Sequence, residues 1–127
     1  MHRYRKHFSR EEARALLPEL RRVFKDAHLR RERARRADDK LGELMRKTGA
    51  DVGGRPVTDL LMDLQQMRAQ MERVQKLGVV IKDFDRGLVD FPHLRKGREV
   101  FLCWELDEDD IEFWHDLDTG YAGRERL

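Results

Sequence analysis

Apolar residues recur at helical spacing through the first third of the chain. Ser9-Arg-Glu-Glu12 matches a capping box, in which the serine accepts a backbone N–H and the glutamate reaches back, so a helix is predicted to start there. We predict that this helix reaches about Lys47, with a kink or a separate first turn near Pro18, because proline removes a backbone donor. Its stripe of apolar or small residues comprises Ala13, Leu16, Leu17, Leu20, Val23, Phe24, Ala27, Ala34, Ala37, Leu41, Leu44 and Met45.

A second amphipathic helix is predicted after a glycine-rich loop. Thr48 to Pro56 contains three glycines and a proline, which favour a loop followed by the first turn of a helix. The helical spacing then returns up to Leu77, and Gly78 is suited to end the helix. Its apolar positions are Val57, Leu60, Leu61, Leu64, Met67, Met71 and Val74.

Together the two stripes predict a long antiparallel helical hairpin over residues 1–77. The first helix is predicted to be much the longer, so part of its stripe stays uncovered by the second helix. We therefore expect a homodimer with a bundle-like interface.

Beyond Gly78 the pattern changes to period two and to β-branched residues. Val79–Lys82, Leu88–Phe91 and Arg98–Leu106 predict a small three-stranded antiparallel meander, with turns at residues 83–87 and 92–97. One face of the last strand is predicted to be core and comprises Val100, Leu102, Trp104 and Leu106. The other face comprises Glu99, Phe101, Cys103 and Glu105.

A short C-terminal helix is predicted after the meander. Asp107 is a suitable N-cap, the carboxylates of residues 108–110 favour the helix dipole, and Gly120 would end the helix. The fold class is therefore α+β, in a single domain over residues 1–127 that joins a helical hairpin (1–77) to a β-meander plus short helix (78–127).

Charge is unevenly distributed along the chain. Residues 1–47 hold 16 Lys and Arg against 8 Asp and Glu, whereas residues 78–127 hold 7 against 13. This asymmetry is compatible with head-to-tail association, with an acidic partner for the basic part, or equally with soluble surfaces that have no partner. No apolar run is long enough to cross a membrane, and MHRYRKHFSR lacks the apolar region of a signal peptide, so a cytoplasmic protein is expected.

Several motifs together resemble a known family. They are Phe8-Ser-Arg-Glu-Glu-Ala-Arg-Ala-Leu-Leu-Pro18, Gly87-Leu-Val-Asp-Phe-Pro92, Gly97-Arg-Glu-Val-Phe-Leu-Cys-Trp104, Ile111-Glu-Phe-Trp-His115 and Gly120-Tyr-Ala-Gly-Arg124. In combination they resemble the prokaryotic domain-of-unknown-function 2203 family. The resemblance implies a small bacterial cytoplasmic protein with no assigned activity, and it supplies no catalytic residues.

Candidate metal chemistry rests on an E-x-x-H pair. On the predicted C-terminal helix, Glu112 and His115 would share one side, and Asp118 follows three residues later. Convergence with Asp90, His93 and Glu105 would strengthen a site for Mn, Fe or Zn. The alternative is that His115 hydrogen-bonds a carboxylate and braces the helix, and that Asp90 bonds backbone N–H groups in a turn.

Two other candidates have plainer interpretations. Cys103 has apolar and acidic neighbours, which raise the pKa of a thiol, so a buried structural cysteine is expected rather than a nucleophile. An arginine-rich stretch of the first helix suggests nucleic-acid binding, but acidic residues alternate with it as on a solvated helix. Its arginines are Arg30, Arg31, Arg33, Arg35 and Arg36.

Packing, capping and charge explain most of these positions without requiring chemistry. The favoured interpretation is a non-enzymatic interaction or scaffold protein that homodimerises through its helical hairpin. The alternatives are a metal-binding protein or metal-dependent enzyme, and a nucleic-acid-associated protein.

Overall fold

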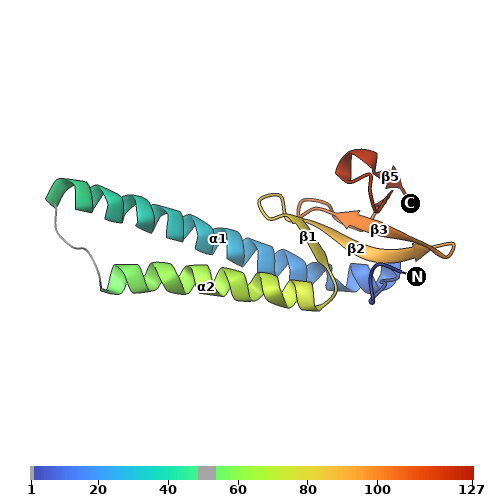
Figure 1. Cartoon of the computed structure of the whole chain (residues 1–127), viewed down its shortest axis with the longest axis horizontal. Helices are drawn as coiled ribbons and strands as arrows, with labels where there is room; N and C mark the ends of the chain where they lie inside the picture. The colour runs from blue at the N-terminus through green and yellow to red at the C-terminus, as the bar shows by residue number, and fades with distance from the viewer. Residues whose placement is uncertain (1, 49–53) are drawn as a thin grey trace. The chain divides into compact units, whose positions relative to one another are not determined.

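The computed structural model describes residues 2–48 and 54–127, which form two helices and an antiparallel five-stranded sheet. Figure 1 labels the main elements. The helices are α1 (Arg10–Thr48) and α2 (Arg55–Lys76), and a short 3-10 helix spans Tyr121–Gly123. The strands are β1 (Val80–Asp83), β2 (Leu88–Arg95), β3 (Arg98–Trp104), β4 (Phe113–Asp116) and β5 (Glu125–Arg126). The α+β class is confirmed.

The chain divides into two compact units. The sheet unit comprises Met1–Phe24 with Glu72–Leu127, and the helical unit comprises Lys25–Met71. The predicted loop between the helices falls mainly on residues 49–53, which lie outside the described residues. Across residues 2–48 and 54–127, no helix is both long and apolar enough to cross a membrane.

The predicted capping box starts α1. The Glu12 N–H donates to Ser9 Oγ at 3.0 Å, and the Ser9 N–H donates to Glu12 Oε1 at 2.9 Å. α1 then runs through Pro18 as one helix, so the alternative of a separate first turn is wrong. The helix buries Leu17, Leu20 and Phe24 in the sheet unit.

The sheet follows the chain in the order β1-β2-β3-β4-β5, and each neighbouring pair is antiparallel. The three predicted strands correspond to β1, β2 and β3, but β4 and β5 extend the sheet beyond the predicted meander. The predicted partition of β3 into two faces agrees with the register, because Leu102 lies opposite Phe91 and Cys103 lies opposite Asp90. Both faces of this strand are buried.

The predicted C-terminal helix is wrong. Residues 113–116 form β4, and the consecutive aromatic residues Phe113 and Trp114 are typical of a strand, where they lie on opposite faces. The acidic residues before it bind tertiary partners instead of capping a helix: Arg14 Nε donates to Asp110 Oδ1 at 2.8 Å, and Arg21 Nη2 donates to the Asp109 carbonyl at 2.8 Å. Arginines of α1 thus bind this acidic segment, which was expected to be stabilised by a helix dipole.

The predicted turn at residues 92–97 is also shorter than expected. β2 continues through Pro92, which lies opposite Phe101, and only Lys96 and Gly97 form the turn, both at positive φ. The Pro92 carbonyl accepts from the Phe8 N–H at 2.7 Å, and β1 pairs with β2 only up to Asp90. The missing proline N–H therefore removes no ladder hydrogen bond.

Candidate functional site

One face of the sheet gathers polar side chains from three strands. Glu99, Phe101 and Cys103 alternate along β3 on this face. Asp90 of β2 lies opposite Cys103, and His115 of β4 lies opposite Phe101. Titratable groups from sequence positions 25 residues apart thus meet across the sheet.

Asp90 and His115 form a buried pair. His115 Nε2 lies 3.0 Å from Asp90 Oδ1, and His115 Nδ1 lies 2.7 Å from the Asp116 carbonyl oxygen. Both side chains are almost completely excluded from solvent. Because each ring nitrogen faces an oxygen that can only accept, the imidazolium with two N–H donors satisfies both contacts. Lys82 Nζ, 4.0 Å from Asp90 Oδ2, adds a further cation.

The surroundings of His115 act on its pKa in opposite directions. Burial disfavours the charged ring, but the hydrogen bonds to Asp90 and to the Asp116 backbone outweigh burial and raise the pKa above its ordinary value. The contacts of both ring nitrogens and the raised pKa therefore favour the protonated, charged form of His115.

This raised pKa predicts a pH dependence of stability. A histidine whose folded-state pKa exceeds the unfolded value of 6.5 adds stability that is complete below that value and is lost as pH rises through the folded pKa. The free energy of unfolding of the wild type, measured by urea denaturation, should therefore fall as pH rises above 6.5, and by more than that of Asp90→Asn. Equal falls in the two proteins would contradict the assignment.

Cys103 shares this buried environment. Burial, together with the neighbouring Asp90 carboxylate, raises the pKa of the thiol well above its ordinary range. The thiolate is the reactive and metal-binding form of cysteine, so Cys103 is suited to packing rather than to nucleophilic chemistry. The expectation that Cys103 is buried is confirmed.

Arg124 covers the end of this face near Cys103. Its guanidinium lies 3.8 Å from the centre of the Phe113 ring and 4.5 Å from that of Tyr121, and it pairs with Glu108. The terminal Gly-Tyr-Ala-Gly-Arg motif therefore packs onto the sheet by stacking an arginine between aromatic rings.

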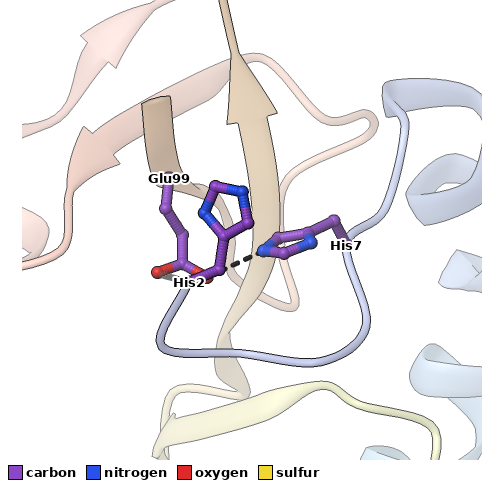
Figure 2. Close-up of side chains that lie close together, drawn as sticks. All are labelled: His2, His7 and Glu99. Carbon is purple, nitrogen blue, oxygen red and sulfur yellow. Dashed lines mark hydrogen bonds and ion pairs between the residues drawn. The ribbon is translucent and has the colours of Figure 1, made fainter. Parts of the chain in front are cut away.

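A second cluster lies at the other end of the same face, where the N-terminal segment meets β3. Figure 2 shows His7 directed towards the Glu99 carboxylate, with the His2 side chain beside it. His7 Nε2 lies 2.7 Å from Glu99 Oε2, and one donor atom from each of the three residues lies within 4.8 Å of the others. Sequence reasoning missed this cluster, because Glu99 is 92 residues from His7 and no local spacing joins them.

The structure brings together only two of the six predicted metal ligands, Asp90 and His115. The i,i+3 argument for Glu112 and His115 fails, because it requires a helix and His115 lies in β4. His93 points to the opposite face of β2, with Nδ1 2.6 Å from the Phe8 carbonyl oxygen. Glu105 instead pairs with Arg86, and exposed Asp118 lies 3.9 Å from Arg3.

Most of the predicted nucleic-acid contacts already have acidic partners within the helical unit. Arg30 and Arg33 contact Asp63 at 3.1 and 2.5 Å. Arg35 and Arg36 contact Glu32 at 2.6 and 3.2 Å. These ion pairs neutralise charge that phosphate binding would use. Arg31 takes part in a further interaction, and nucleic-acid binding stays a prediction.

The helical unit has very little core of its own. Among its described residues only Ala27, Ala34 and Gln70 are buried. An open groove separates α1 from α2 on one side of the unit, with a floor of Ala34, Leu60 and Leu64. Arg31, Arg35 and Asp38 line its α1 rim. Apolar side chains therefore line a surface that the unit leaves open.

The fold and its sites define a small α+β protein with a buried acid–histidine pair and an open helical unit. The family model described as an uncharacterized conserved protein (DUF2203) matches residues 6–127, and the chain belongs to this family. The predicted family resemblance is confirmed. No curated protein and no solved structure shows a significant match to the chain.

Proposed function

We propose that this chain is a non-enzymatic interaction or scaffold protein that homodimerises through an antiparallel helical hairpin. One observation carries the proposal: large apolar side chains of the helical unit are exposed, including Leu61 at 53% and Leu64 at 44% of their full accessibility. An exposed patch of large apolar side chains is typical of an interface.

The sequence of α2 gives the reason for this exposure. At 100° per residue, Leu60, Leu61 and Leu64 spread over about 100° of the helix circumference and form one broad apolar side. An amphipathic helix is stabilised when another helix covers an apolar side of this width. Within the chain, α1 covers only one side of this segment, so a second hairpin would complete a four-helix arrangement.

We take a second copy of the chain as the occupant of the groove, because the α1 residues that line it carry charges of both signs. In a two-fold interface each residue contacts the partner's equivalent surface in reverse. On α1, Arg31 and Arg35 precede Asp38 along the rim of the groove. An antiparallel crossing near residue 36 would therefore place the arginines of each copy beside the aspartate of the other.

The buried acid–histidine pair supports a non-enzymatic role. Asp90 and His115 are the charged groups that converge most closely among the predicted site residues, yet their side chains are only 2% and 1% exposed. A general acid or base must come within hydrogen-bond reach of its substrate. The pair instead links β2 to β4 across β3.

Leu64→Glu should dissociate the dimer. On α2, Leu64 faces the groove, whereas Met62, which is similarly exposed at 55%, lies about 160° away around the helix. A carboxylate without a partner in an apolar interface costs several kcal/mol, so the dissociation constant should rise about 100-fold or more. Sedimentation velocity at tens of micromolar measures the change.

Met62→Glu is the matched control and should stay dimeric, and circular dichroism should show equal helix content in both variants. A wild-type chain that sediments as a monomer at these concentrations would overturn the proposal. Equal dissociation of the two variants would contradict the assigned face.

A further inference from the structure

We propose that His2, His7 and Glu99 bind a divalent first-row transition metal, of which Zn²⁺ is the probe of choice, where the N-terminal segment crosses β3. This inference is independent of the proposed dimer. It rests on the geometry and burial of the three side chains in Figure 2.

Glu99 is a fixed and ionised ligand. Its side chain is only 9% exposed, and its carboxylate accepts the Arg3 N–H at 2.8 Å and the Tyr4 N–H at 2.9 Å. Partial burial raises its pKa, but the hydrogen bonds from His7, Arg3 and Tyr4 outweigh burial and lower the pKa to about 2. The carboxylate therefore needs no deprotonation before it binds a cation at neutral pH.

The N-terminal segment holds His7 beside this carboxylate. Tyr4 packs edge-on against Phe101 at 5.4 Å between ring centres, and the Phe8 N–H donates to the Pro92 carbonyl. His7 lies between these two anchors along the chain and is mostly buried. Such support orients a metal ligand and restricts its alternative rotamers.

His2 completes the donor set. Its ring lies edge-on to the His7 ring, with centres 5.0 Å apart, and it is exposed. Donors bound tetrahedrally at 2.0–2.1 Å lie about 3.3 Å from one another, so His2 has to approach by about 1.5 Å at most. Rotation of an exposed side chain supplies a movement of this size.

The chemistry of the donor set selects the class of metal. Two imidazole nitrogens with one carboxylate suit Zn, Fe, Ni or Cu, whereas Mg²⁺ and Ca²⁺ prefer oxygen ligands only. Three protein ligands leave one tetrahedral position for water. Binding would replace the hydrogen bond between His7 Nε2 and the Glu99 carboxylate with a bridging ion.

The neighbouring cluster of Asp90, Cys103 and His115 is a weaker metal site. All three residues are buried, and the thiol would have to lose a proton in surroundings that favour the protonated form. Both nitrogens of His115 are already engaged. The two clusters can be distinguished experimentally, because only the buried one offers sulfur.

The test is titration of the untagged full-length protein with Zn²⁺ by calorimetry and with Co²⁺ by absorption spectroscopy. We expect one equivalent to bind, with no binding of Mg²⁺ and no sulfur-to-cobalt charge-transfer band. His2→Ala, which removes an exposed side chain, should weaken Zn²⁺ binding about 10-fold or more, and Glu99→Gln should weaken it at least as much.

His28→Ala and Cys103→Ser are the matched controls, and each should bind within about twofold of the wild type. Failure of the wild type to bind Zn²⁺, or undiminished binding by His2→Ala, would overturn the proposal. A sulfur-to-cobalt band that disappears in Cys103→Ser would overturn it in favour of the buried cluster.

Discussion

Replacing Asp90 with alanine is expected to lower the free energy of unfolding by about 3 to 5 kcal/mol, because it leaves the buried imidazolium of His115 without its counter-charge. The partners of Asp90 explain the size of the effect: His115 Nε2 is 3.0 Å away, Lys82 is at 4.0 Å, and water has almost no access. Chemical denaturation at neutral pH measures the loss.

Two further variants separate the pair from general damage to the sheet. Asp118→Ala removes a carboxylate that is 96% exposed and should change stability by less than about 0.5 kcal/mol. In a double-mutant cycle, Asp90→Ala and His115→Ala should couple by about 2 kcal/mol or more, since the second change removes the charge that the first left unpaired. Additive effects would show that the two side chains do not act as a pair.

Replacing Gly87 with alanine is expected to lower the free energy of unfolding by about 2 to 3 kcal/mol. Gly87 has φ 61°, which an L-residue with a side chain adopts only at a cost. A Cβ atom there would also lie 2.7 Å from Leu106 Cβ, so the turn before β2 would have to move away from the end of β3. Thermal and urea denaturation both report this change.

Gly97 provides the matched control for the steric part of this effect. It has φ 78°, also in the left-handed region, but a Cβ atom there meets nothing within 4 Å. Gly97→Ala should therefore cost only the conformational part, about 1 kcal/mol. If both variants lose the same stability, the close approach of Leu106 contributes nothing.

The sequence predicted those parts of the fold that local patterns determine. The capping box at Ser9, the alternation along β3 and the turn before Gly87 depend on neighbouring residues, and the structure contains all three. The C-terminal helix failed because its evidence was a run of carboxylates, which stabilise a helix start only when no better partner exists. Arg14, 96 residues earlier, binds the Asp110 carboxylate, and Arg21 binds the backbone carbonyls of Glu108 and Asp109.

The candidate sites show the same limit. Sequence reasoning identified Asp90 and His115 separately, but their meeting depends on the register of three strands. The cluster of His2, His7 and Glu99 depends on the path of the N-terminal segment across the sheet, which no periodicity encodes. Both sites therefore depend on contacts between residues that are distant in the sequence, and arguments from residue spacing cannot predict such contacts.

The buried pair also affects which alignment of the strands forms during folding. A slip of one residue between β2 and β3 would turn every β2 side chain to the opposite face. Asp90 would then enter the apolar layer of Phe91 and Leu102, and His115 would lose its counter-charge. Misaligned sheets would thus carry two unpaired buried charges, so the pair acts as a selector of strand alignment, whatever its net contribution to the stability of the correct one.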